Sequence, residues 1–588
     1  MRRVLVTTAI EETWPSADQP VLFLGEWCRL YSRKDQWEKR SAVLAPYHWD
    51  DRKKLADDYR YLSSLYETVL QELSLRLNAI HGVDHSVRYW RILVGPWLGY
   101  FMQMLFDRWF MLKRVIDGGA GVVSCRVLDR DELSVIPNDM ADFHRLFPND
   151  DWNEAMYAQL MRRYWADAIT LEGVACSSDS SLVGSRDTKG RDGLKETIKS
   201  VLGTFSKVFS RDQDYFFISS YLPLQFEVQL QMRLGQAPAL WQSAGTPRVE
   251  PSAAWRAWSL GTEGDGLEGF DKVAREMIPG HIPTAYLEGY EQLRICIDAL
   301  PWPSKPKAMF TSNSYSADDV FKCWAGDRVE SGVPLVIGQH GGNFGMTPFA
   351  FYEDQQISIA DKWFSWGWAD AERPNVLPVG NLKGFGGTVP YDKQGGALMV
   401  EMTMPRYSYY LYSAPIAGQY LDYLDDQMQF ISALSHELQQ QVLLRLYHHD
   451  YGCCQQERWM AKFPDIRVDD GSTNIRALIR KSRLYISTYN ATTYLESLSW
   501  NVPTIMFWNP QHWELKDEVQ PYFDQLKSVG IFHETPESAA RQMEAVWDDV
   551  DEWWHSSEVQ EVRRSFCERF AHIPSDPMGE MVRVLQEC

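Results

Sequence analysis

The sequence has no long uncharged hydrophobic run, no regular cysteine pattern and no excess of positive charge. Its most apolar window, residues 92–106, is shorter than the ~20 residues that a membrane-spanning helix needs, so we expect a buried helix there. The nine cysteines are scattered without CxxC or Cys/His spacing, which predicts neither a zinc site nor a disulfide framework. The first residues do not read as a signal peptide. These absences predict a reduced, cytoplasmic protein, with peripheral contact at the inner membrane left open.

The charge balance is strongly acidic. Lysine and arginine number 59 against 79 aspartates and glutamates, which gives a formal net charge of −20. Non-specific nucleic-acid binding needs a basic surface, so we do not expect a nucleic-acid partner. One local pocket can still oppose the global sign and hold an anion. With 45% hydrophobic and 23% charged residues, the composition is that of a globular protein, and 588 residues suffice for two or more domains.

Short apolar runs alternate with segments of helical periodicity, which predicts an α/β fold with parallel, helix-covered sheets. The runs that predict strands are residues 3–7, 21–25, 41–46, 307–312, 334–337, 362–366, 376–380, 397–401, 442–447, 483–487 and 502–507. We interpret them as two Rossmann-like, doubly wound domains that face a cleft. Residues 1–388 form the acceptor-side domain with a helical insertion at about 60–290, and 389–588 the donor domain with C-terminal helices. Glycine density, which is highest at the predicted hinge that ends at Gly387, and a shift in composition place the boundary near residues 385–395.

One predicted strand, residues 334–337, leads into the turn Gly338-Gln-His-Gly-Gly-Asn-Phe-Gly345. Its glycines permit positive φ angles and a close approach of a ligand to the backbone. Ligands bind at the carboxyl ends of strands in open α/β sheets. His340 in such a turn is a candidate for acid/base chemistry or for phosphate contact. A tight turn with a structural imidazole is the alternative.

A second turn of this kind is Ser487-Thr-Tyr-Asn-Ala-Thr-Thr-Tyr-Leu-Glu496, between a predicted strand and a helix. A helix N-terminus offers backbone N–H groups and partial positive charge to a phosphate. Ordinary capping explains one hydroxyl, whereas four hydroxyls and an asparagine exceed that need. The residues predicted to bind the donor are Ser487, Thr488, Asn490, Thr492, Thr493 and Glu496, joined by Arg445 and His448 from the end of the strand at 442–447. A metal site in His448-His-Asp450 is disfavoured, since adjacent residues rarely point at one ion.

The order of these motifs resembles bacterial surface-polysaccharide transferases of GT-B architecture. The Gln-His-Gly turn comes first, then Val379-Gly-Asn381, the basic tail at 442–449, the strand–turn–helix at 484–496 and Val502-Pro-Thr-Ile505. The relatives are the glycosyltransferases of capsule and O-antigen synthesis that use CMP-Kdo and, more remotely, the CDP-glycerol polyol-phosphate transferases. Gly25-Glu-Trp27, His48-Trp-Asp-Asp51 and Tyr89–Trp97 are most similar to an O-antigen-locus transferase family first named from Leptospira.

In the CDP-glycerol relatives the Gln-His-Gly histidine serves the reaction centre, and the serine-rich turn holds the donor phosphates. The resemblance therefore implies that His340 is catalytic and that the hydroxyls of the second turn bind the donor. It implies a metal-independent enzyme that needs no cofactor. Such an enzyme moves Kdo or a related ulosonic acid from a CMP-linked donor to a surface polysaccharide or a lipid-linked glycan. This chain has Ser-Thr-Tyr-Asn-Ala-Thr-Thr where the relatives have Asp-Tyr-Ser-Ser, which leaves the donor open.

The N-terminal part must then supply the acceptor side. Glu26, Asp50 and Asp51 follow predicted strands and are candidates for a catalytic base or nucleophile. Arg52, Arg88 and Arg91 are candidates for a clamp on an acceptor or on the carboxylate of an ulosonic acid. Salt-bridged surface charges are the alternative for each of them.

Three other functions stay open. A metal-dependent GT-A enzyme would use Asp129-Arg-Asp131 as a DxD-type site. A polyol-phosphate or carbamoyl transferase would use the same cleft for another group. A binding protein descended from such an enzyme would not need His340.

Overall fold

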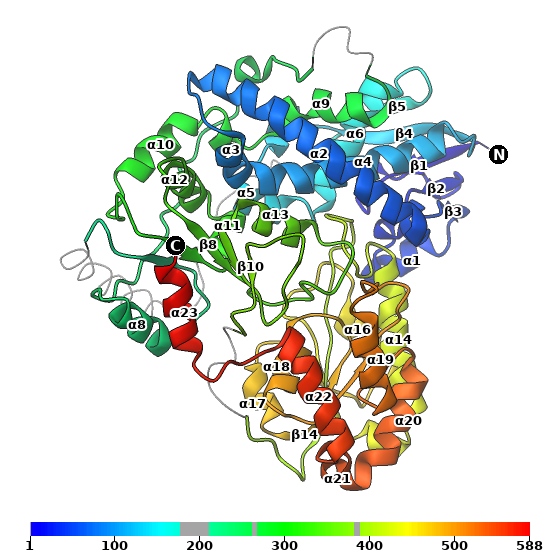
Figure 1. The fold of residues 1–588 in the computed structure, drawn as a ribbon. Coiled ribbons are helices and arrows are strands. Elements are labelled where there is room, and N and C mark those ends of the chain that lie inside the picture. The colour runs from blue at the N-terminus through cyan, green and yellow to red at the C-terminus, as the bar shows by residue number, and fades with distance from the viewer. Residues whose placement is uncertain (1, 177–210, 262–266, 382–388) are drawn as a thin grey trace.

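The computed structural model describes residues 2–176, 211–261, 267–381 and 389–588. Its described strands form three sheets, and every strand pair in them is parallel. Figure 1 shows the first two sheets in the upper part and the third in the lower part. The predicted α/β class with parallel, helix-covered sheets is confirmed.

The first sheet has the strand order β3-β2-β1-β4-β5. Its strands are β1 Arg3–Val6, β2 Val21–Phe23, β3 Ala42–Leu44, β4 Val122–Asp129 and β5 Thr170–Ala175. The short helix α1 Lys34–Trp37 precedes β3. Between β3 and β4 lie α2 Arg52–His81, α3 Val87–Leu93 and α4 Gly95–Ile116, and α5 Met140–Leu146 and α6 Asp150–Tyr164 follow β4. Most residues of α4 are buried, which confirms the helix expected at 92–106. Within the described ranges, no helix combines the length and apolarity needed to cross a membrane.

The second sheet has the order β10-β9-β8-β7-β6. Its strands are β6 Phe216–Ile218, β7 Met309–Thr311, β8 Leu335–Gly338, β9 Lys362–Phe364 and β10 Val376–Leu377. Its helices are α8 Leu224–Arg233, α9 Gly269–His281, α10 Tyr290–Asp298, α11 Ser314–Ala317, α12 Asp319–Glu330 and α13 Phe351–Ile359. The stretch interpreted as a helical insertion thus supplies strands to two different sheets. β6 has only three residues, all buried, so its sequence shows no periodicity.

The third sheet has the order β13-β12-β11-β14-β15-β16. Its strands are β11 Gly396–Val400, β12 Val442–Arg445, β13 Arg467–Asp469, β14 Ser482–Ser487, β15 Thr504–Phe507 and β16 Phe532–His533. Its helices are α14 Gln419–Ala433, α15 His436–Gln439, α16 Gln455–Lys462, α17 Ile475–Ile479, α18 Thr492–Ser499, α19 Gln520–Ser528, α20 Pro536–Val546, α21 Val550–Trp554 and α22 Ser557–Phe570. The predicted glycine-rich hinge falls largely on 382–388, outside the described residues, and the division at 388/389 stays a prediction.

The last helix, α23 Pro577–Gln586, does not stay with the third sheet. It packs beside α8 (Figure 1), and Met581 and Leu585 share a buried cluster with Phe217 and Phe310 of the second sheet. Burying side chains of this size stabilises by roughly 1.5–3 kcal/mol each. The sequence analysis predicts that the C-terminal helices belong to the donor domain. The packing of α23 against the second sheet does not support this prediction for α23.

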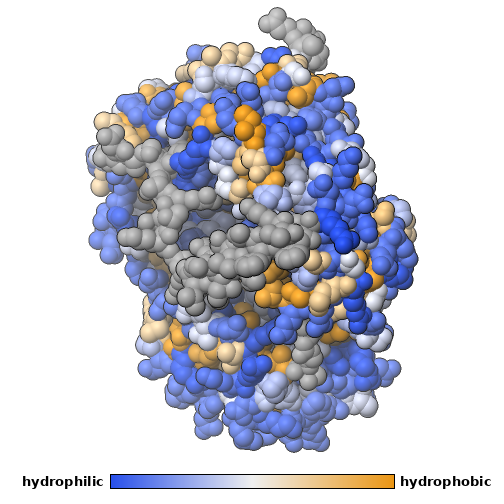
Figure 2. All heavy atoms as spheres, turned by 90° about the vertical axis from the view of Figure 1, so that its left-hand side faces the viewer, coloured by the Kyte–Doolittle hydropathy of each residue, from blue (hydrophilic) through white to orange (hydrophobic). Residues whose placement is uncertain are grey.

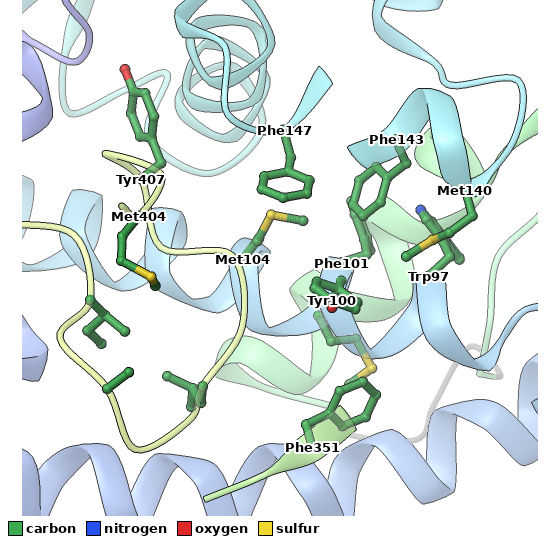
Figure 3. Packing of buried hydrophobic residues seen from close by; sticks show 14 of the residues in the cluster. Trp97, Tyr100, Phe101, Met104, Met140, Phe143, Phe147, Phe351, Met404 and Tyr407 are labelled. Atoms are coloured by element: carbon green, nitrogen blue, oxygen red, sulfur yellow. The ribbon is translucent and has the colours of Figure 1, made fainter. Parts of the chain in front are cut away.

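An irregular segment, residues 401–418, connects β11 to α14 and lies against the N-terminal part. Arg108 of α4 is buried and donates from Nη1 to the Ser408 carbonyl at 2.6 Å and to Asp107 at 2.8 Å. Arg406 pairs with Asp150 at 2.7 Å. Figure 3 shows Met404 and Tyr407 of this segment near the aromatic core of α4 and α5. These contacts hold the segment that follows β11 against α4 and α6, the helices beside the first sheet.

Candidate active site

His340 follows β8 at the carboxyl edge of the second sheet and is half-buried. Its Nδ1 lies 3.4 Å from the hydroxyl of Tyr315 in α11. The ring of Phe344 lies 5.6 Å away, and the ring of Tyr221 stacks at 6.1 Å. Burial raises the pKa of Tyr315 well above its ordinary value, so its hydroxyl stays protonated. The imidazole is therefore oriented by a neutral hydroxyl and flanked by aromatic rings.

Tyr221 belongs to a strained turn after β6. Ser219 and Tyr221 have φ angles of 45° and 58°, the left-handed region that non-glycine residues rarely adopt. Ser312 Oγ donates to the Ser220 carbonyl at 2.9 Å, and Ser220 Oγ donates to Glu227. Such strain persists only where surrounding contacts hold it, and it gathers at functional sites. The turn places the Tyr221 ring against His340.

The glycine turn after His340 touches the second predicted turn directly. Gly342 has a φ of 79°, and its N–H donates to Thr492 Oγ1 at 2.8 Å. A Cβ at Gly341 would lie 2.2 Å from that same oxygen, which is too close for any side chain. Gly345 donates to the buried carboxylate of Glu353 at 2.6 Å. The close approach of the two turns thus requires glycine at 341.

α18 starts at Thr492, and no described side chain caps its N-terminus. The neighbouring hydroxyls serve other groups: Thr488 Oγ1 bonds to the Val400 carbonyl at 2.8 Å and to Tyr423 at 2.7 Å. Ser487 Oγ donates to the Tyr489 carbonyl, and Thr493 Oγ1 to the Tyr489 hydroxyl, both at 3.3 Å. The predicted hydroxyls therefore shape the turn, and its amides are the groups suited to an anion.

Asn490 lies in the same turn and is 1% exposed. Its Oδ1 accepts from the Tyr494 hydroxyl at 2.9 Å, whereas Nδ2 has no partner among the described residues. An unpaired buried donor costs about 1–3 kcal/mol. The amide is thus a further donor beside the α18 N-terminus. Glu496 lies half-buried one turn further along the helix.

Arg445 and His448 have different surroundings. Arg445 donates to Asp469 at 2.9 Å and to the Gly471 carbonyl at 3.0 Å, so it ties β12 to the loop after β13. His448 is exposed and lines a cavity of about 610 Å³ between the α5–α6 region and the loop after β12. His144 and Arg406 also line this cavity.

The predicted carboxylates of the first sheet lie near the start of α14. Glu26 pairs with Arg29 and packs against Gly418. Asp50 accepts from Gln419 Nε2 at 3.2 Å, and burial raises its pKa. Asp51 caps α2 by accepting from two backbone amides at 3.0 and 3.2 Å. These contacts do not bring the three carboxylates into the neighbourhood described above for His340.

The predicted arginine clamp is not assembled. Arg52 forms a double hydrogen bond with Glu514 at 2.6 and 2.9 Å. Arg88 pairs with Asp361 at 2.8 Å, and Arg91 pairs with Glu67. Because Asp361 precedes β9, Arg88 lies at the edge of the second sheet opposite to His340. Each guanidinium already holds a carboxylate of the chain itself.

Comparison with known proteins gives a family. The sequence model of a family described as LIC12162 family transferase matches residues 3–585. The chain belongs to this transferase family.

Two solved structures show distant similarity to the chain. The wall teichoic acid polymerase TagF is 10% identical with a TM-score of 0.28, and the match covers 67% of this transferase and 93% of TagF. A TagF variant soaked with CDPG is 10% identical with a TM-score of 0.29, covering 67% and 95%. Likeness this distant establishes neither a shared fold nor a shared activity. No curated protein matches the chain.

In two acidic motifs of the transferase, carboxylates accept hydrogen bonds from nearby backbone amides. Asp131, of the formal DxD motif, accepts from the Leu133 amide at 3.0 Å and caps a short helical turn. Asp450, Cys454 and Glu457 bring possible metal-ligating atoms within 4.8 Å of one another. The Asp450 carboxylate already accepts from two backbone amides before α16, at 2.7 and 3.1 Å.

Sequence analysis missed Tyr221 and Tyr315. Both follow short strands of the second sheet, and a search for polar residues after every buried run would have found the β6 turn. The bond to Thr492 joins positions 150 residues apart, and a single sequence carries no signal for it.

Proposed function

We propose that this transferase moves a glycosyl group from a nucleotide-linked donor to a hydroxyl of a surface polysaccharide or a lipid-linked glycan. The donor phosphates bind at the N-terminus of α18, and His340 serves the reacting hydroxyl. The observation that carries the proposal is the contact between the β8 turn and the α18 turn. It places an imidazole and an uncapped helix N-terminus beside each other.

The chemistry follows from these two groups. The bond between the anomeric carbon and the phosphate oxygen breaks, and a bond from that carbon to the acceptor oxygen forms. Nε2 of His340 takes the acceptor's proton, with Nδ1–H directed at the Tyr315 oxygen. The helix dipole and the Asn490 amide stabilise the negative charge that develops on the departing phosphate.

The first donor to test is a CMP-linked ulosonic acid such as CMP-Kdo. The family resemblance of the motifs supports this donor. The arginines predicted to bind its carboxylate do not support it, because they are paired within the chain. Since Arg52, Arg88 and Arg91 each hold an internal carboxylate, a donor without a carboxylate is the second candidate. A CDP-linked polyol phosphate would use the same phosphate site and the same histidine.

A thermal-shift panel of CMP, CDP, UDP and GDP tests the donor site. A ligand at 100 times its Kd stabilises the folded state by about 2.7 kcal/mol. We expect a cytidine nucleotide to raise Tm and a purine nucleotide to leave it unchanged. If no nucleotide shifts Tm, the donor-site assignment fails.

A further inference from the structure

Tyrosine rings extend from His340 across the segment 401–418 toward the cavity of about 610 Å³. Ring centroids are 6.3 Å apart from His340 to Tyr315, and 5.6 Å from Tyr315 to Tyr352. Tyr100 bridges Tyr352, at 5.9 Å, and Tyr410, at 5.1 Å. Helices α11, α13 and α4 and the segment 401–418 all contribute to this row.

The row continues to the cavity wall. Tyr410 stacks on Tyr412 at 4.4 Å. Burial raises the pKa of Tyr412, and the nearby hydroxyls of Tyr410 and Tyr451 raise it further. Tyr451 and Tyr447 line the cavity, and Tyr447 is 45% exposed. Ring contacts thus run from the candidate reaction centre to Tyr412, and Tyr447 and Tyr451 lie at the wall of the cavity.

Tyr315 and Tyr100 are 0% and 5% exposed and belong to the core, whereas Tyr352, Tyr410 and Tyr412 are half-buried. Half-buried rings with hydroxyl groups offer both an apolar surface and hydrogen-bonding groups. Elsewhere, the face in Figure 2 is mainly hydrophilic, and its hydrophobic side chains form small patches.

We propose that the half-buried tyrosines of this row, Tyr352, Tyr410, Tyr412 and Tyr451, bind the acceptor and that the acceptor is a carbohydrate chain. The inference rests on the proposed transfer at His340. Pyranose rings present C–H faces to aromatic rings and hydroxyls to polar groups, and the row supplies both. A polyanionic acceptor would need unpaired cations along the row, whereas Arg406 beside the cavity is paired with Asp150. The cavity, with its histidines and amide groups, holds the far end of the chain.

The test uses Tyr410→Leu and Tyr412→Leu, which keep apolar volume and remove the ring. Tyr410→Phe and Tyr412→Phe keep the ring and remove the hydroxyl. Tyr61→Leu is the matched control, because Tyr61 is 38% exposed on α2 and bonds to Asp271, away from the row. Thermal melts exclude unfolded variants. The readouts are retention on an array of bacterial polysaccharide fragments and the Tm shift with CMP.

The unaltered chain should be retained on a subset of the glycans. The leucine variants should lose about tenfold in apparent affinity, the phenylalanine variants less, and Tyr61→Leu nothing. The CMP shift should be unchanged in all five variants. The proposal is overturned if the unaltered chain binds no glycan, if the leucine variants bind normally, or if they lose only the CMP shift, which would make the row a nucleotide-base site. If the unaltered chain binds glycans and the leucine variants do not, but no nucleotide shifts Tm, the donor site of the proposed function fails and the row remains a carbohydrate site without an assigned reaction.

Discussion

The backbone N–H of Gly342 donates a hydrogen bond to Thr492 Oγ1 at 2.8 Å. This bond joins the second sheet to the third, and it brings the His340 turn to the N-terminus of α18. A Cβ at Gly341 would meet the same oxygen at 2.2 Å. The geometry of the candidate active site therefore depends on one glycine and one threonine hydroxyl.

Gly341→Ala should abolish most transfer activity while leaving the chain folded, because the added methyl forces the two turns apart. Gly245→Ala is the control: that glycine has open space around it, so activity and Tm should stay close to those of the unaltered chain. Turnover and thermal melts of both variants check this. Normal turnover by Gly341→Ala would show that the contact is not needed.

His340→Ala should reduce turnover by at least about a hundredfold, the lower range for loss of a general base, without changing Tm by more than a few degrees. Tyr315→Phe should retain more activity but shift the pH–rate profile, since it removes the oxygen beside Nδ1. Steady-state rates across pH measure both. Unchanged function in His340→Ala would instead favour a binding protein.

Asp107→Ala should destabilise the fold by about 3–5 kcal/mol, because it leaves the buried Arg108 guanidinium without its carboxylate. Arg108 also donates to the Ser408 carbonyl of the segment 401–418, so the substitution should also weaken the contact of this segment with α4. Lys113→Ala is the control on the same helix. It breaks an exposed pair with Asp117, worth about 0–1 kcal/mol. Urea unfolding compares them, and equal effects would contradict the account.

Glu401, at the end of β11, should make stability fall as pH rises. Burial raises the pKa of this carboxyl to about 8, partly opposed by bonds from Trp459 and Gln455. In the unfolded chain this carboxyl loses its proton above the ordinary pKa of about 4.3, whereas in the folded chain it keeps the proton up to about pH 8. The free energy of unfolding should therefore fall as the pH rises between these two values. Glu401→Gln should remove this part of the slope and raise Tm at pH 8, whereas the exposed Glu437→Gln should not. Parallel Tm profiles for Glu401→Gln and the unaltered chain would contradict the shift.

The sequence was informative where a motif follows a buried strand. The turns after β8 and β14 are recognisable in the sequence by glycines and hydroxyl residues directly after apolar runs. Both turns lie at the strand ends where the sequence predicts them. The ion pairs of the arginines could not be predicted in this way. Arg52, for example, pairs with Glu514, which is 462 residues away in the sequence. The hydroxyl of Thr488 was predicted to hold phosphate, yet the nearer Val400 carbonyl and Tyr423 occupy it. Partners of this kind are set by packing, which a single sequence does not reveal.

The most direct test of the phosphate site places a charge in the first turn of α18. Thr493→Asp favours the helix dipole but repels an anion at the N-terminus, whereas Thr493→Asn has the same size without charge. Calorimetric titration with the nucleotide that shifts Tm compares the two. The account predicts that Thr493→Asp loses binding by at least about tenfold while Thr493→Asn retains it. Equal affinity in both variants would contradict a donor phosphate at this helix.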